Sequence, residues 1–411
     1  MMTSTVSSPP GLPWTCPFCA LLCDGHAVAL APQAQLLGSR CPMAVGAVAG
    51  IKPLAVATPT VEGKPADYES ALSAAADILG RCRQPLFGGL ATDVAGCRGL
   101  YRLADACGAI LDHACGEALM HSLRALQDRG GYFTTLAEIR NRADLVVCIA
   151  TDPVENHPEF FRRCSPADQV AERSRRVFLG VPAGDAGEEV PLAGDLFDGL
   201  AYLAARLAGH RVEGNLALDA LARRMQAATY TVLVWEPAGL PAQGALIAET
   251  IQRLVNTLNR TTRAAAFALG GGDGGATANQ VLAWLSGLPL RTGVHRRGLV
   301  HEPLRYGTEH LLASRAVDAL LWISSFDPKR LPPPAELPRV VLGHPDLAAG
   351  LAAEHTVFIP VSTPGVGSAG HLFRTDGVVV PLHALYADPL PTVAQVVADL
   401  AERLPARGKT Q

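Results

Sequence analysis

The stretch ADLVVCIATDPVENHP at residues 143–158, with its echo VDALLWISSFDPKRLP at residues 317–332, decides the fold class. Each begins with an unbroken apolar run of strand length and continues through a short polar turn to an Asp-Pro pair. Such runs are typical of strands buried on both faces, as in parallel sheets covered by helices. Asp152 and Asp327 then follow the carboxyl ends of two strands, where ligands bind in open α/β sheets. The alternative is that each Asp-Pro pair only caps and turns the chain.

The same alternation of apolar and helical segments continues on both sides of these stretches. Strands are predicted at residues 85–90, 109–112, 144–150, 176–181, 231–235, 263–269, 317–324, 340–343 and 356–361. Helices are predicted at residues 94–106, 195–207, 215–227 and 243–258. The order of elements predicts an α/β protein with several parallel sheets flanked by helices.

Three domains are expected along the chain. Residues 1–50 form a small cysteine-bearing module, and residues 51–165 with 330–411 form a first α/β domain. Residues 166–329 form a second, Rossmann-like α/β domain.

Composition and charge exclude several classes of protein. The 411 residues include 35 Lys and Arg against 38 Asp and Glu, and this charge balance gives no indication of a basic surface that would bind nucleic acid. No apolar run reaches the roughly 20 residues of a membrane-spanning helix, and the first residues lack the pattern of a signal peptide. All ten cysteines lie at or before Cys164. We therefore expect a cytoplasmic chain whose thiols serve metal binding or packing.

Four of these cysteines form the motif CPFCALLCDG followed by RCP. Cys16, Cys19, Cys23 and Cys41 are spaced C-x2-C-x3-C-x17-C. Four thiolates can hold a [4Fe–4S] cluster or a tetrahedral zinc ion, and the x3 gap departs from the paired C-x2-C of zinc sites. The spacing favours an iron–sulfur cluster, and the alternative is a relic motif that has lost its metal. We assign the other thiols to packing, with Cys115 treated separately: Cys82, Cys97, Cys107, Cys148 and Cys164.

Cys115 lies in DHACGEA, directly after the predicted strand at 109–112. A thiolate at a strand's carboxyl end can ligate a metal or attack a carbonyl, although a lone cysteine is more often buried for packing. The segment GSAGHLFRTDGVVVPL contains Arg374 and Asp376 before a further strand, and a turn with a salt bridge is its simplest interpretation.

Two further segments are candidates for anion binding. The loop GGGDGG at residues 270–275 lies between the predicted strand at 263–269 and a helical segment, so its backbone N–H groups can face a phosphate. It lacks the Walker lysine and the GxGxxG spacing. His295, Arg296, Arg297 and Arg305 form a basic cluster that binds an anion or is simply solvated. HExxH and GxSxG motifs are absent from the sequence, which disfavours zincin and hydrolase chemistry.

The motifs together resemble one family. CPFCALLCDG is similar to the N-terminal cluster motif of molybdopterin oxidoreductases, specifically of the B subunit of formylmethanofuran dehydrogenase. The resemblance continues, in order, through FTTLAEIRNRADLVVCIATDPVENHPEFFRR, ALGGGDGGATANQVLAWLSGLP and IPVSTPGVGSAGHLFRTDGVVVPL. It spans most of the chain and implies the fold of the first three domains of formate dehydrogenase.

The resemblance also implies a cofactor set. Cys16, Cys19, Cys23 and Cys41 would hold a [4Fe–4S] cluster, next to a molybdenum or tungsten bis-pterin guanine dinucleotide. Cys115 falls at the metal-ligating position and Arg297 at a pocket arginine. The residues implied to contact the pterin nucleotides are Asp152, Asp327, Gly271, Gly272, Gly274 and Gly275.

One departure from the family pattern changes the expected activity. The family has a catalytic histidine after its metal ligand, whereas Gly116 follows Cys115 and has no side chain to relay a proton. The bacterial formyltransferase/hydrolase relatives move a formyl group from tetrahydromethanopterin to a methanofuran-type carrier and hydrolyse it to formate. Their partners are an amidohydrolase-like A subunit, a C subunit and a formyltransferase D subunit.

Three hypotheses follow from the resemblance and this departure. In the first, the chain is a redox-silent B subunit that serves as a scaffold of a formyl-transferring complex. In the second, it is an active dehydrogenase subunit that interconverts carbon dioxide and formate. In the third, it acts alone on formate. Gly116 favours the first hypothesis, and the four N-terminal cysteines favour the second.

Overall fold

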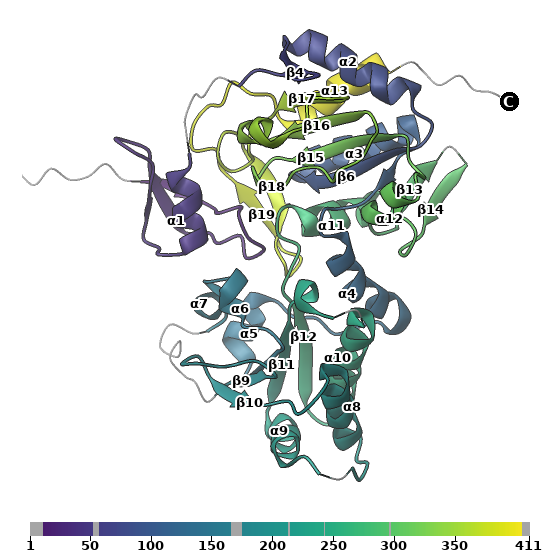
Figure 1. Cartoon of the computed structure of the whole chain (residues 1–411). Helices are drawn as coiled ribbons and strands as arrows, with labels where there is room; N and C mark the ends of the chain where they lie inside the picture. Colours follow the sequence, from purple (N-terminus) through teal and green to yellow (C-terminus); the bar gives the residue numbers. More distant parts are fainter. Residues whose placement is uncertain are drawn as a thin grey trace, which may run out of the picture. The chain divides into compact units, whose positions relative to one another are not determined.

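The computed structural model describes residues 11–51, 57–165, 175–212, 214–241, 243–295 and 297–404. The chain forms two compact units (Figure 1). The first unit contains residues 1–114, 277–373 and 379–411, and the second contains residues 115–276 and 374–378. Each unit has a sheet with parallel strands and flanking helices, so the predicted α/β class is confirmed.

The first unit is built on a nine-stranded sheet in the order β14-β13-β7-β6-β15-β16-β17-β4-β5. Its five central strands run parallel, and the strands at both edges are antiparallel. The strands are β4 (Thr60–Val61), β5 (Lys64–Pro65), β6 (Pro85–Ala91), β7 (Ile110–Leu111), β13 (Thr292–His295), β14 (Gly298–His301), β15 (Ala319–Ser324), β16 (Arg339–Gly343) and β17 (Thr356–Pro360).

Three helices of the first unit pack together on one face of this sheet (Figure 1). They are α2 (Tyr68–Arg81), α3 (Val94–Cys107) and α13 (Val393–Arg403). Helix α3 begins where the Asp93 side chain accepts a hydrogen bond from the Gly96 N–H at 2.9 Å, and it ends at Gly108, which has φ 73°. A short helix, α12 (Thr308–Ala313), contributes Leu311 to the cluster around the buried Trp322.

The cysteine motif lies in a small N-terminal module of the first unit. The module has a three-stranded antiparallel sheet, β1 (Leu12–Trp14), β2 (His26–Ala29) and β3 (Gln35–Leu37), followed by α1 (Pro42–Ala49). Its buried cluster centres on Trp14, Val28 and Ala44 and includes Leu385 from the distant C-terminal part. The indole N–H of Trp14 donates to the Gly365 carbonyl at 2.7 Å, so the module is anchored to the rest of its unit.

The second unit has a five-stranded, fully parallel sheet in the order β10-β9-β8-β11-β12. The strands are β8 (Leu145–Ile149), β9 (Arg176–Leu179), β10 (Glu188–Val190), β11 (Tyr230–Trp235) and β12 (Arg263–Ala268). Odd-numbered residues of β8 and β11 pack against α8 (Leu196–Leu207), α9 (Leu216–Ala227) and α10 (Gly244–Leu258). The remaining helices of this unit are α4 (Gly116–Arg129), α5 (Leu136–Arg142), α6 (Pro153–Asn156) and α7 (Phe160–Cys164).

A few other elements complete the two units. Helix α11 (Gly275–Ser286) follows β12, and the hairpin of β18 (Gly370–Phe373) and β19 (Val379–Leu382) precedes α13. The 3-10 helices are η2 (Pro237–Gly239) and η3 (Pro345–Gly350). No helix in the described ranges is long and apolar enough to cross a lipid bilayer.

The two units differ from the predicted domain boundaries at 51–165, 166–329 and 330–411. The echo strands belong to different sheets: β8 pairs with β9 and β11, whereas β15 pairs with β6 and β16. Hydrogen-bond partners in a sheet, and not neighbours along the sequence, decide which unit a strand joins. For this reason β8 belongs to the second unit, and β15 belongs to the first.

Candidate functional site

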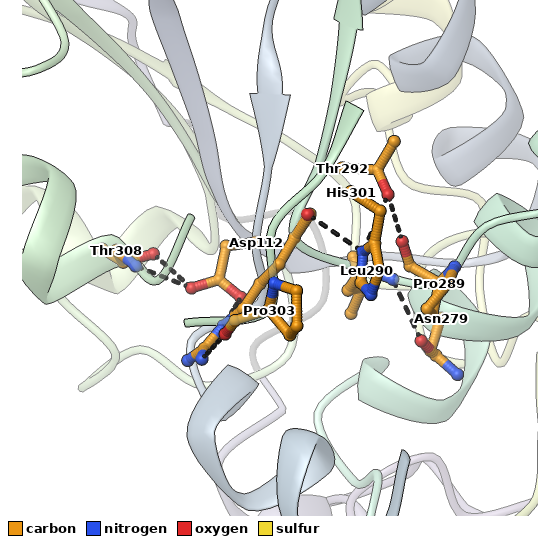
Figure 2. A network of polar contacts seen from close by, with 9 residues as sticks. Asp112, Asn279, Pro289, Leu290, Thr292, His301, Pro303 and Thr308 are labelled. Atoms are coloured by element: carbon orange, nitrogen blue, oxygen red, sulfur yellow. Dashed lines mark hydrogen bonds and ion pairs between the residues drawn. The ribbon is translucent and has the colours of Figure 1, made fainter. Parts of the chain in front are cut away.

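A buried ion pair lies at the carboxyl end of β7 in the first unit. The side chains of Asp112 and Arg291 are 2% and 5% exposed, and Arg291 Nε donates to Asp112 Oδ1 at 3.3 Å. The other carboxylate oxygen accepts two hydrogen bonds from Thr308, from N–H at 2.8 Å and from Oγ1 at 2.9 Å (Figure 2). Burial raises the pKa of Asp112, although the Arg291 guanidinium and Thr308 act in the opposite direction.

The network extends from this pair to the β13–β14 hairpin. Arg291 Nη1 donates to the Pro303 carbonyl at 2.5 Å, and the Arg291 carbonyl lies 3.1 Å from His301 Nδ1. The Asn279 side chain accepts from the Leu290 N–H at 3.2 Å, which fixes the chain just before Arg291 (Figure 2). Burial lowers the pKa of His301. Together these contacts hold the hairpin against the end of β7.

The two predicted catalytic residues are Cys115 and Arg297. Arg297 lies in the hairpin turn with an exposed side chain, and its neighbour Arg296 is outside the described residues. Cys115 is the N-cap residue of α4, is partly exposed, and makes no side-chain cap hydrogen bond. Gly116 is buried at the first position of α4, so the position directly after the thiol has no acid–base side chain, and the first such side chain of α4 is that of Glu117.

A second polar cluster lies at the carboxyl ends of β8 and β11 in the second unit. Glu236 follows β11, and its two oxygens accept from Thr151 Oγ1 and Asn156 Nδ2, both at 2.9 Å. His157 Nδ1 lies 3.7 Å from Glu236 Oε1, with both side chains less than a tenth exposed. Burial acts to raise the pKa of Glu236, but the nearby His157 side chain and the hydrogen bonds from Asn156 and Thr151 outweigh it and lower the pKa.

The lowered pKa of Glu236 predicts how the free energy of unfolding depends on pH. Because the folded-state pKa of Glu236 lies below the ordinary 4.5, its ionised form stabilises the fold above pH 4.5, and that stabilisation is lost as the pH falls through the folded-state pKa. We expect Glu236→Gln to lower the free energy of unfolding by about 1.5–3 kcal/mol at pH 7, the range for hydrogen bonds to a charged group. Urea unfolding at pH 7 and at about pH 3 measures this, and the difference from wild type should shrink at the lower pH. If wild type and Glu236→Gln differ in free energy of unfolding by the same amount at both pH values, the ionised form of Glu236 is not what stabilises the fold.

The two strand-end aspartates make local contacts. Asp152 Oδ1 accepts from the Val154 N–H at 3.2 Å and caps α6. Asp327 Oδ1 accepts from the Lys329 N–H at 2.8 Å, and its other oxygen lies 3.9 Å from Arg330 Nε. These contacts are those of the capping alternative, in which Asp-Pro turns the chain.

The glycine-rich loop is a tight turn that opens α11. Gly271 and Gly274 have φ values of 77° and 76°, a region that glycine tolerates best. The N–H groups of Gly275 and Ala276 donate back into the loop at 2.9 Å, and the Gly270 N–H donates to Thr375 Oγ1 at 3.3 Å. These donors are therefore already used within the second unit.

The segment that carries Thr375 was also singled out in the sequence. Arg374 donates twice to Asp376, at 2.7 and 2.8 Å, and Asp376 also accepts from the Leu136 N–H at 3.0 Å. The predicted turn with a salt bridge is present, and it anchors residues 374–378 in the second unit.

The four N-terminal cysteines lie within one module. The Cys16 N–H donates to the Cys23 carbonyl at 3.0 Å. Burial raises the pKa of the Cys16 thiol, and Cys19, Cys23 and Cys41 raise it further. Within the described ranges, no three His, Cys, Asp or Glu side chains converge into a group that could hold a metal ion. Four cysteine thiols are the ligand set of a [4Fe–4S] cluster, and binding of a cluster by this module stays a prediction.

Five of the other six cysteines lie in the packed interior. None of the ten cysteines, all of them in the described ranges, forms a disulfide. The five assigned to packing are all buried: Cys82, Cys97, Cys107, Cys148 and Cys164.

Sequence reasoning missed the residues that form the two buried polar clusters. Asp112 ends a predicted strand and Glu236 directly follows one, so the available signal was an acidic residue at the end of an apolar run. The pairing with Arg291 spans 179 positions and had no local signal.

The chain is thus a two-unit α/β protein with a parallel sheet in each unit and polar residues at the strand ends. No family model matches it. It is 33% identical over 362 residues to the B subunit of the formyltransferase/hydrolase complex Fhc of Methylorubrum extorquens, covering 85% of this chain and 98% of that protein. The chain belongs to the family of this B subunit.

Two further comparisons agree with this family. The crystal structure of the FhcABCD complex of M. extorquens with methylofuran contains a chain that matches with a TM-score of 0.73 and 31% identity, over 84% of this chain and 98% of that one. The B subunit of the tungsten-containing formylmethanofuran dehydrogenase 2 of Methanocaldococcus jannaschii is 26% identical over 413 residues, covering 91% of this chain and 93% of that protein.

Proposed function

We propose that this chain is the B-type subunit of a formyltransferase/hydrolase complex in one-carbon metabolism, and that it is redox-silent. Its partners would be an amidohydrolase-like A subunit, a C subunit and a formyltransferase D subunit, with a methanofuran-type carrier held by the complex. The assembly role is supported by 33% identity to the B subunit of the Fhc complex, which extends over 98% of that protein. We also propose the molybdopterin oxidoreductase type of fold and a cytoplasmic location, where cysteines remain reduced.

Gly116 is the observation that carries the redox-silent role. Reduction of carbon dioxide at a metal–pterin needs a proton donor beside the metal ligand, and the position after Cys115 offers only a buried glycine. Other residues that would serve a pterin dinucleotide make local contacts instead, as Asp152 and Asp327 do. In this proposal the side chains stabilise local backbone turns and the chain supports the assembly of the partner subunits. It does not transfer electrons.

Metal analysis of the assembled complex tests this proposal. The chain is co-expressed with the A-, C- and D-type subunits, and iron, molybdenum and tungsten are measured together with the visible spectrum. We expect a colourless complex with less than about 0.1 atom of iron, molybdenum or tungsten per chain, because a redox-silent subunit needs neither a [4Fe–4S] cluster nor a metal–pterin. A brown complex with four irons and one tungsten or molybdenum per chain would overturn the redox-silent role.

A substitution in the cysteine motif provides the second test. We expect Cys16→Ala to leave formate release by the complex within about twofold of wild type, since a factor of two is less than 0.5 kcal/mol in activation free energy. Cys82→Ala, at a buried thiol outside the motif, is the matched control for thiol loss. Loss of activity in an intact Cys16→Ala complex would contradict the proposal.

The alternative is an active formylmethanofuran dehydrogenase subunit with cluster and metal–pterin. The retained spacing of Cys16, Cys19, Cys23 and Cys41 favours it, as does the likeness to the B subunit of the tungsten-containing enzyme. The metal analysis separates the two candidates directly.

A further inference from the structure

An exposed tryptophan marks one face of the first unit. Trp284 on α11 is 65% exposed, the most of any tryptophan in the described ranges. The guanidinium carbon of Arg98, on α3, lies 5.9 Å from the centroid of its ring. Exposed tryptophan paired with arginine is the composition found at the energetic centre of protein interfaces.

The same face carries two arginine side chains that form no ion pair with a described carboxylate. Arg98 and Arg102 lie one turn apart on α3, and both are exposed. Like charges at this spacing destabilise a helix slightly. In the part of the chain that the structure describes, no carboxylate lies within 4.0 Å of either guanidinium, although Asp105 follows on the same helix.

A small apolar cavity lies beneath the two helices. A small pocket is lined by apolar side chains of α3 and α11, Tyr101 and Leu282 among them, and by Leu90, Leu111 and Leu290. Every lining side chain except Tyr101 is buried, so the surface itself offers a tryptophan and two arginines. Such a surface fits a segment that offers carboxylates beside an apolar side chain.

We propose that this α3–α11 face docks an acidic segment of a neighbouring subunit, a proposal that rests on the assembly role above. Arginine pairs with carboxylate in a two-pronged geometry, and tryptophan supplies apolar area at little cost in conformational entropy. A second copy of the chain fits poorly, because a two-fold interface would place the two arginine pairs against each other. A nucleic acid also fits poorly, because the chain's net charge is −3.

Recovery of partner subunits tests the surface. The tagged chain is co-expressed with the A-, C- and D-type subunits, and the amount of each recovered per chain is measured at physiological salt. We expect Trp284→Ala and the double variant Arg98→Glu/Arg102→Glu each to lower recovery of one subunit at least tenfold, with an unchanged thermal midpoint. Arg98→Lys/Arg102→Lys, which retains the charge, should lose less.

Two exposed residues of the second unit serve as matched controls. Leu216→Ala removes an apolar side chain that is 85% exposed, and Arg223→Glu reverses an exposed charge on α9. Both should recover every subunit at the wild-type level. If wild type itself recovers none, the assembly role fails; if wild type and the α3–α11 variants recover all subunits equally, only the docking surface fails.

The identity of the docked segment is tested by a photo-crosslinking amino acid in place of Trp284 in the assembled complex. We expect a crosslink to a peptide of another subunit that contains aspartate or glutamate. A crosslink to a second copy of this chain, or to a segment without acidic residues, would overturn the proposal.

Discussion

Asp112→Ala is expected to lower the free energy of unfolding of the first unit by about 3–5 kcal/mol, the usual effect of removing one partner of a buried ion pair. The variant leaves the Arg291 guanidinium, 5% exposed, without its carboxylate, and it removes the acceptor for both donors of Thr308. Urea unfolding followed by tryptophan fluorescence measures the loss. Hydrogen exchange in β7 and β13 should rise with it, because the pair holds the hairpin to β7.

A double variant separates the buried charge from the lost contacts. Because burial raises the pKa of Asp112 despite Arg291, the pair does not fully offset its own desolvation. Asp112→Ala/Arg291→Met should therefore be more stable than Asp112→Ala alone. The exposed pair of Arg81 and Asp77, with side chains 84% and 67% exposed, is the control, and Asp77→Ala should cost less than about 1 kcal/mol. Equal losses of free energy of unfolding for Asp112→Ala and Asp77→Ala would show that the buried ion pair stabilises the fold no more than an exposed one.

The secondary structure followed from local patterns. The apolar runs at 144–150 and 317–324 are β8 and β15, and the helix predicted at 94–106 is α3. These elements were predictable because burial on both faces demands continuous apolar residues, and because Asp93 and Gly108 mark the helix ends. The α4 and α13 helices were missed, although Thr392 and Gln395 form a capping box at the start of α13.

The order of strands in the sheets and the buried polar clusters could not be predicted from local sequence patterns. The nine-stranded sheet places β7 beside β13, whose residues are some 180 positions away in the sequence, and hydrophobic patterning does not specify such partners. The roles of Asp152 and Asp327 were left open because one residue type serves both capping and ligand binding. Only the contacts of each carboxylate separate the two uses.

Gly89→Ala is expected to lower the free energy of unfolding by about 2–5 kcal/mol, from a left-handed backbone cost of roughly 1–2 and a packing cost of about 1–3. Gly89 lies in β6 with φ 74°, and an added Cβ would lie 2.4 Å from the Ile323 carbonyl oxygen and 3.0 Å from its nitrogen. Both atoms are backbone of β15, so no side-chain rotation relieves the clash. The register between β6 and β15 shifts at this point, between Trp322 and Ser324. Thermal and urea unfolding measure the loss.

Gly25→Ala is the matched control for this clash. Gly25 has φ 79°, close to that of Gly89, but an added Cβ would meet no atom within 4 Å. Backbone strain is therefore common to both variants, and only Gly89→Ala adds the collision with β15. We expect the control to cost roughly 1–2 kcal/mol. If the two variants lose the same stability, the close approach of β6 to β15 is not what requires glycine, and the shifted register must tolerate a side chain there.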